Sequence, residues 1–243
     1  MIHSRCDSHT IFTKTAMGST NFNARRKFIG TLATGATAGT LAPLMQTIQA
    51  AAAPAQTKLA ADAEEWIRLK IKGEHRIVFD GPEPHNAFPI IWTWAYYLTN
   101  NQTGSEDEDM TGMCVLRHNA IPFAMADNLW SKYKFGEVFG ITDNTTQAPA
   151  VRNPYWEPKD GDYPLPGIDG IKRMIERGAL FCVCDLALTV YSSNLARNMG
   201  LDPTAVKEEW VAGVLPGIQV VPSGVWALGR AQEHGCGYIY AGG

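Results

Sequence analysis

Short apolar segments alternate with helix-like segments along most of the chain, and this alternation constrains the fold more than any other feature. Five such segments are bounded by turn residues or charges, as β-strands are. They cover residues 75–80, 113–118, 179–184, 218–221 and 238–240. The third is apolar throughout, as is typical of a strand buried in a parallel sheet. Because helical patterns separate the segments, we expect an open parallel α/β sheet of about five strands with right-handed crossovers.

Apolar spacing, prolines in first turns and closing glycines predict the helices. We expect them at residues 59–72, 88–99, 122–134, 168–177, 186–199, 203–211 and 224–234. Between the third and fourth of these, residues 142–167 are rich in Pro, Asn and Gly and predict a long irregular excursion. Long ordered loops often serve as lids or partner surfaces.

Charge divides the chain into two unequal parts. Residues 1–53 carry five Lys and Arg against Asp7 alone, whereas the remainder carries 16 basic and 23 acidic residues, a net charge of −7. The whole chain has a net charge of −3 and no long Lys/Arg block. Binding of DNA or RNA depends on such a basic footprint, so we expect no nucleic-acid partner.

The first 53 residues resemble a twin-arginine export signal. Arg25-Arg26-Lys27 precedes a weakly apolar stretch, Gly30–Ile48, and a small-residue cleavage zone follows at Ala50–Ala53. The alternative is an uncleaved membrane anchor, but the glycines, threonines and Pro43 of this stretch make a poor span. The resemblance implies export through the twin-arginine machinery, a periplasmic location and no stable membrane span after cleavage.

This interpretation divides the chain into three parts. Residues 1–53 are the signal peptide, residues 54–74 are a linker and N-terminal helix, and residues 75–243 are one α/β domain.

Ligands of open α/β sheets bind outside the carboxyl ends of the strands. The residues expected there are Asp80, His118, Cys184 with Asp185, and Ser223-Gly224. The sequence lacks the G-x-G-x-x-G, G-x-x-x-x-G-K-[ST] and G-x-S-x-G motifs, so no motif supports NAD, ATP or serine-hydrolase chemistry. The sequence leaves the cofactor unknown.

Cys184 is the candidate nucleophile. It ends a predicted strand just before a helix, where the helix dipole and free amides lower a thiol's pKa. Cys114 and Cys182 fall inside strands and are most simply core residues. Cys236 and His234 lie in the last helix-to-strand turn, from which Cys236 could form a disulfide with Cys184, or both could join Cys184 at a metal. No C-x-x-C pair or clustered His supports a metal site strongly.

The neighbours of Cys184 have functional and structural interpretations. His118 could tune the thiol if its strand lies beside that of Cys184, or it could be structural. Asp185 could orient a ligand or cap the following helix, and Ser223 with Gly224 could bind an anion or form an ordinary helix cap. The acidic run Glu106–Asp109 lacks the spacing of a calcium loop, so we interpret it as a solvated loop.

Four blocks of the chain resemble the DsrE/DsrF-like family, which includes sulfur-relay proteins. They are Val115–Ala120, Phe181–Leu188, Val214–Gly224 and Gln232–Tyr240. The resemblance implies a flavodoxin-like sheet, a sulfur-accepting cysteine at position 184 with His118 in the pocket, and homo-oligomers.

We therefore expect an exported protein that handles sulfur through Cys184, as a persulfide carrier or a sulfurtransferase-like enzyme. Its partners would be a small sulfur compound and a sulfur-acceptor protein. Two alternatives remain. One is a non-catalytic periplasmic protein that binds a small ligand or a metal. The other is an interaction subunit of an exported redox complex, in which residues 142–167 contact the partner.

Overall fold

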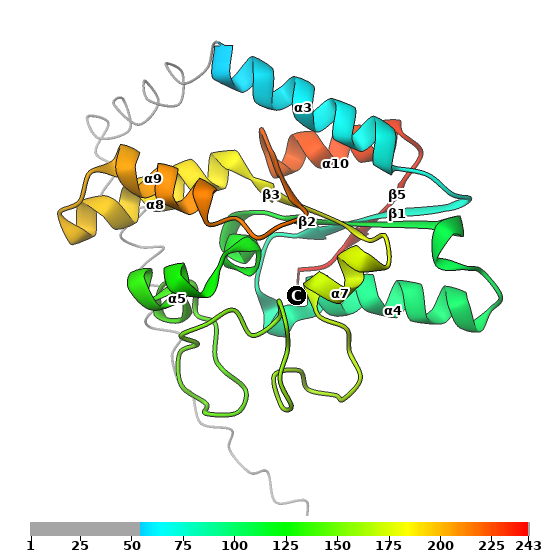
Figure 1. The fold of residues 1–243 in the computed structure, drawn as a ribbon, viewed down its shortest axis with the longest axis horizontal. Coiled ribbons are helices and arrows are strands. Elements are labelled where there is room, and N and C mark those ends of the chain that lie inside the picture. The colour runs from blue at the N-terminus through cyan, green and yellow to red at the C-terminus, as the bar shows by residue number, and fades with distance from the viewer. Residues whose placement is uncertain (1–53, 243) are drawn as a thin grey trace, which may run out of the picture. The chain divides into compact units, whose positions relative to one another are not determined.

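Five parallel strands form one sheet in the computed structural model, which describes residues 54–242. The strand order is β4-β3-β2-β1-β5, so the chain moves outward from β1 to β4 and returns to the far side of β1 (Figure 1). The strands are β1 (His75–Gly81), β2 (Met110–Leu116), β3 (Leu180–Cys184), β4 (Ile218–Val221) and β5 (Gly237–Tyr240). The expected open parallel α/β sheet of about five strands flanked by helices is confirmed.

Helices cover both faces of this sheet. Helices α3 and α10 lie on one face, α4 and α7 on the other, and α5, α8 and α9 beside the carboxyl ends of the strands (Figure 1). The α-helices are α3 (Pro54–Lys70), α4 (Phe88–Gln102), α5 (Asp127–Tyr133), α6 (Phe135–Phe139), α7 (Ile171–Glu176), α8 (Asp185–Met199), α9 (Pro203–Ala212) and α10 (Gly224–Glu233). Three 3-10 turns are η1 (His85–Ala87), η2 (Asp107–Asp109) and η3 (His118–Ala124).

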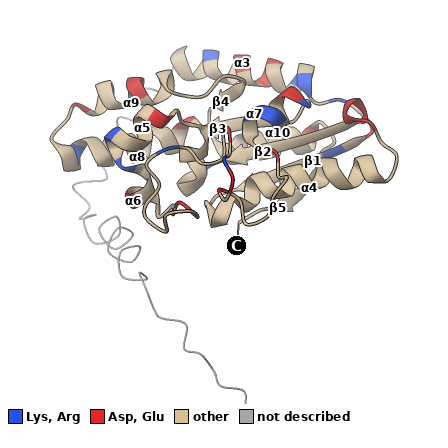
Figure 2. Ribbon diagram, turned by 60° about the horizontal axis from the view of Figure 1, so that its bottom comes forward, with Lys and Arg blue, Asp and Glu red and all other residues tan. Residues whose placement is uncertain are grey.

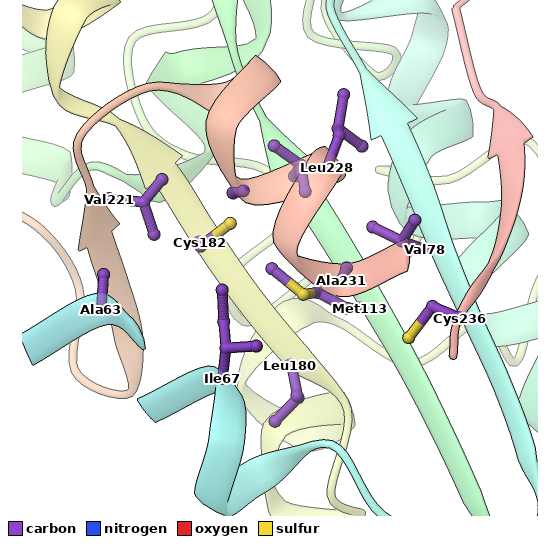
Figure 3. Close-up of a cluster of buried hydrophobic side chains, with 12 residues drawn as sticks. Ala63, Ile67, Val78, Met113, Leu180, Cys182, Val221, Leu228, Ala231 and Cys236 are labelled. Atoms are coloured by element: carbon purple, nitrogen blue, oxygen red, sulfur yellow. The ribbon is translucent and has the colours of Figure 1, made fainter. Parts of the chain in front are cut away.

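The core between the sheet and helices α3 and α10 is apolar and tightly filled. Ala63 and Ile67 of α3 meet Ala231 and Leu228 of α10 above the strands (Figure 3). Cys182 of β3 is buried in the same cluster. Full burial of one such aliphatic side chain contributes about 1.5–3 kcal/mol, so this layer fixes α10, and with it the carboxyl edge of the sheet.

Two differences from the expected element boundaries bear on the site and its surroundings. Strand β2 spans Met110–Leu116, so His118 does not end it but begins η3 with a positive φ of 50°. The helix expected over residues 122–134 is two elements, because η3 ends at Ala124 and α5 begins at Asp127. The division of the expected helix shortens it to α5, and the earlier end of β2 turns His118, a candidate site residue, away from the strand.

The segment of residues 142–167 contains no helix or strand, as expected, but it is firmly attached. Asp162 is 1% exposed and accepts hydrogen bonds from Arg152 at 2.6 and 2.9 Å. Asn153 donates to the carbonyl oxygens of Phe123 and Met125. The Asn153 side chain thus ties the segment to η3, and its backbone amide, which donates to Asp127 Oδ1 at 2.8 Å, ties it to the start of α5.

The expected export signal, residues 1–53, lies outside the described residues. Between residues 54 and 242, no helix is both long enough and apolar enough to span a membrane. The expected linker and N-terminal helix of residues 54–74 contain α3, which occupies Pro54–Lys70.

Candidate functional site

Cys184 lies at the carboxyl edge of the sheet, where two helices begin. It is the last residue of β3 and the N-cap of α8, and the amide of Ala187 donates a hydrogen bond to its Sγ at 3.3 Å. The amides of Gly224, at the start of α10, and of Leu186 also stabilise its anionic form. Its sulfur therefore faces the N–H groups of two helix starts, an arrangement that favours negative charge.

Burial opposes this stabilisation. Cys184 is only 6% exposed, and burial raises the pKa of its thiol above the ordinary value, with the amides of Ala187 and Gly224 acting in the opposite direction. The expectation of a lowered pKa at this position is therefore wrong, because desolvation of the thiolate outweighs the two helix starts. The resting form of Cys184 at neutral pH is the protonated thiol.

Beside Cys184, a row of three charged or polar side chains, Arg117, Asp80 and Tyr238, extends across the neighbouring strands β2, β1 and β5. Arg117, just after β2, donates two hydrogen bonds to Asp80 of β1, at 2.6 and 2.9 Å. The Tyr238 hydroxyl of β5 donates to the same carboxylate at 2.8 Å. Asp80 is 3% exposed, so its charge is held inside the protein by these two partners.

Arg117 joins this row to Cys184. Asp80 is the main cause that raises the pKa of Arg117, and the anionic form of Cys184 acts in the same direction more weakly. The Arg117 stem runs against the start of α10, since a Cβ added to Gly224 would lie 2.6 Å from Arg117 Cβ. Gly224 thus has two roles: it supplies an amide to the sulfur and leaves space for Arg117.

His118 is not part of this row. Its Nδ1 lies 3.1 Å from Glu83 Oε1, its side chain is 51% exposed, and its ring meets that of Tyr191 edge-on. Among the described residues it forms no hydrogen bond with Cys184. The expected pairing is therefore not formed, because β2 ends at Leu116 and the left-handed backbone at His118 turns the chain toward Glu83.

The residues beside Cys184 have structural partners. Asp185 accepts from Lys207 of α9 at 2.5 Å and from Gln56 of α3 at 3.0 Å, so it ties α8 to two other helices. The cap of α8 is Cys184 and not Asp185. Ser223 caps α10, its hydroxyl accepting from the amide of Trp226 at 3.2 Å, which confirms the simple interpretation of that residue.

Cys236 and His234 lie at the opposite edge of the sheet. Cys236 precedes β5, whose first residue pairs with Ile77 near the start of β1. All four cysteines of the described chain are free and buried, so Cys184 and Cys236 form no disulfide there. Residues 54–242 contain no group of three His, Cys, Asp or Glu side chains placed to hold a metal. Within residues 54–242 the structure therefore does not bring Cys184, Cys236 and His234 together.

Two open cavities lie away from Cys184. One, of about 460 Å³, is an apolar groove between α4 and β5, lined by Phe79, Trp92, Ala95, Tyr96, Thr99, Ile239 and Tyr240. The other, of about 400 Å³, is polar and lies beside the acidic run, where Asp107 forms an ion pair with Arg177.

The fold and site define a class of protein: an open parallel α/β domain with a buried cysteine at the carboxyl edge of its sheet. No family model and no curated protein matches the chain. A solved structure of a protein of unknown function from Methanobacterium thermoautotrophicum is similar, with a TM-score of 0.36 and 18% identity. The match covers 69% of this chain and 99% of the other.

Two residues of the site, Arg117 and Tyr238, were not expected from the sequence pattern. Asp80 was identified as a strand-end residue, and Arg117 follows the end of the neighbouring strand. An acid and a base at the ends of adjacent parallel strands lie close together at one edge, and this signal could have predicted the pair. The contact from Tyr238 depends on β5 returning to the far side of β1, which no local pattern indicates.

Proposed function

We propose that this protein accepts a sulfur atom on Cys184 and passes it to an acceptor thiol, after export to the periplasm. The observation that carries the proposal is the sulfur's environment, in which backbone amides from two helix starts act on Cys184. The four sequence blocks that resemble the DsrE/DsrF-like family support the same cysteine. The twin-arginine motif supports the location.

The transfer has two balanced steps. The Cys184 thiolate attacks the outer sulfur of a sulfane-sulfur donor such as thiosulfate, forming one S–S bond while the donor's S–S bond breaks and its electron pair leaves on sulfite. An acceptor thiolate then attacks the terminal sulfur of the Cys184 persulfide, which returns Cys184 as the thiolate. Both steps create or consume an anionic sulfur, the form that amide N–H groups and a cation stabilise.

Burial sets the kind of donor. Because Cys184 is 6% exposed, a compact donor fits the proposal better than a bulky one. The raised pKa of the thiol means that only a small fraction of Cys184 is thiolate at neutral pH, so we expect the first step to accelerate as the pH rises toward that pKa.

The test is persulfide formation on the full chain incubated with thiosulfate, followed by peptide mass spectrometry. We expect the peptide containing Cys184 to gain the mass of one sulfur atom, and Cys184→Ser to abolish the gain. Cys236→Ser is the matched control, because Cys236 is also 6% exposed, and it should leave the gain on Cys184 intact. Absence of the gain from Cys184 in the parent protein would contradict the proposal.

A non-catalytic binding or interaction protein is the second candidate. The burial of Cys184 and its raised pKa favour it, since both describe a structural thiol. Under this hypothesis, Cys184→Ser leaves ligand or partner binding intact, and thiosulfate modifies no cysteine. The sulfur-transfer proposal instead requires thiosulfate to modify Cys184.

A further inference from the structure

A carboxylate is buried directly beside the candidate nucleophile. Asp185 follows Cys184 in the chain and is 7% exposed. Burial is the main cause that raises the pKa of the Cys184 thiol, and the charge of Asp185 acts in the same direction, because a second anion near the sulfur disfavours the thiolate. The transfer proposed above passes through that thiolate, so this carboxylate opposes it unless another group offsets the charge.

Lys207 of α9 is the cation that meets this carboxylate. Helix α9 carries both basic and acidic residues and lies beside α8 (Figure 2). The Lys207 ammonium donates to Asp185 Oδ1 at 2.5 Å and to Thr189 Oγ1 at 2.7 Å, and it lies 3.4 Å from the Asp185 carbonyl oxygen. These three acceptors engage the three N–H donors of the ammonium and hold it beside Asp185.

The remaining contacts of Asp185 leave its charge to Lys207. Gln56 of α3 donates to Asp185 Oδ2 at 3.0 Å, but an amide carries no charge to offset the anion. Arg117 is paired with Asp80, so it does not offset this carboxylate. The Asp185 and Lys207 side chains are 11% and 21% exposed, so solvent screens their interaction less than that of a surface ion pair.

We propose that Lys207 is a positioning residue for the sulfur site. It holds and offsets the Asp185 carboxylate, so that the anionic sulfur forms beside an ion pair and not beside a lone anion. This inference rests on the proposed function, since a reaction that creates an anionic sulfur on Cys184 gains from the pair. A purely structural tether between α8 and α9 would stabilise the fold without changing the reactivity of the thiol.

Alkylation of the native full chain with iodoacetamide at pH 8, followed residue by residue, tests this role. Lys207→Met leaves the Asp185 anion unpaired and should slow alkylation of Cys184 about threefold to tenfold, because one unit of thiol pKa changes the thiolate fraction about tenfold. Asp185→Asn should accelerate alkylation, and the double variant should return it close to the parent rate. Lys207→Arg keeps the cation and should also stay close to the parent rate.

The matched control removes another lysine that joins α9 to a neighbouring helix. Lys132 of α5 pairs with Glu209 of α9 at 2.7 Å, and Lys132→Met should leave the alkylation rate of Cys184 unchanged. Cys236 is the control within each variant. Unfolding would expose both cysteines and accelerate their alkylation, so a misfolded variant would not imitate the expected loss at Cys184.

Two outcomes overturn the role of Lys207: alkylation of Cys184 in Lys207→Met at least as fast as in the parent, or a loss that Asp185→Asn does not reverse. Incubation with thiosulfate separates this inference from the proposed function. If alkylation follows the expected order but thiosulfate modifies no cysteine, sulfur transfer is contradicted, whereas the coupling of Lys207 to Cys184 is supported. If thiosulfate modifies Cys184 equally fast in the parent and in Lys207→Met, sulfur transfer is supported and the role of Lys207 is overturned.

Discussion

Arg117 is the residue on which the candidate site depends most, because it pairs with Asp80 and packs over Gly224, whose amide acts on Cys184. Its guanidinium neutralises Asp80, which is 3% exposed, and its charge favours the anionic form of Cys184. A buried carboxylate left without its cation is costly, whereas an exposed ion pair contributes little. The Arg117 side chain is 26% exposed, so we expect its pair with Asp80 to contribute more stability than an exposed pair and less than a fully buried one.

Arg117→Gln should therefore lower the free energy of unfolding by about 2 kcal/mol. It should also slow persulfide formation on Cys184, because the thiolate loses a neighbouring cation. Urea unfolding and thiosulfate incubation measure the two effects. The control is Arg173→Gln, whose exposed pair with Glu176 should contribute no more than about 0.5 kcal/mol. Equal stability of the two variants would contradict the assigned role of Arg117.

Among the secondary-structure elements, the start of α10 matters most for the site, because its Gly224 supplies an amide to Cys184 and leaves space for Arg117. Two glycines of this helix differ in their surroundings: a Cβ on Gly224 would meet the Arg117 side chain at 2.6 Å, whereas a Cβ on Gly229 would meet nothing within 4 Å. The two positions therefore separate the effect of helix propensity from the effect of crowding at the site.

Gly224→Ala should lower the free energy of unfolding by about 1–3 kcal/mol through overpacking and should slow the reaction of Cys184 with thiosulfate by displacing Arg117. Gly229→Ala should raise stability by about 0.5–1 kcal/mol, as Ala does in a helix interior, and leave the reaction unchanged. Thermal unfolding and peptide mass spectrometry measure both. If the two variants have the same stability and the same rate of reaction with thiosulfate, the position of Arg117 does not depend on the space beside Gly224.

Element type was predictable from the sequence, and the details of the site were not. The span of β4 at residues 218–221 agrees with the prediction because Gly217 and Pro222 bound it on both sides. The pairing of His118 with Cys184 failed because it required the strand to continue two residues past Leu116. A left-handed residue turns the chain there, and no glycine marks it.

The loop after β1 gives a second example of the same limit. His85, Asn86 and Ala87 all have positive φ, at 35°, 51° and 68°. Among non-glycine residues Asn and His are enriched in that region, whereas Ala is not. Tertiary contacts determine such a loop, so local preferences cannot predict how it positions Glu83 beside His118.

The burial of thiols and phenols gives the whole molecule a defined response to alkali. Burial raises the pKa of Cys114 to about 12 and that of Cys236 to about 11. Tyr97 and Tyr155 rise to about 12 for the same reason. The native state therefore keeps protons that the unfolded state releases, so stability must fall as the pH rises.

We expect the free energy of unfolding to be fully retained below about pH 8.5, the ordinary thiol pKa, and to decrease steadily up to pH 11–12, where Cys236 and Cys114 titrate in the native state. Urea unfolding under reducing conditions at a series of pH values measures this slope. Cys114→Ala removes one of the groups, so its slope should be shallower. A stability that stays flat or increases between pH 9 and 11 would contradict these pKa directions.

Cys184 is set apart from the other cysteines of the described chain by its surroundings and not by its exposure. Cys184 and Cys236 are both 6% exposed, but amides from two helix starts act on Cys184, whereas Arg76 alone lowers the pKa of Cys236, which rises to about 11. Alkylation of the native full chain with iodoacetamide at pH 8, followed residue by residue, compares them directly. We predict faster modification of Cys184 than of Cys236; equal rates, or the reverse order, would contradict the claim.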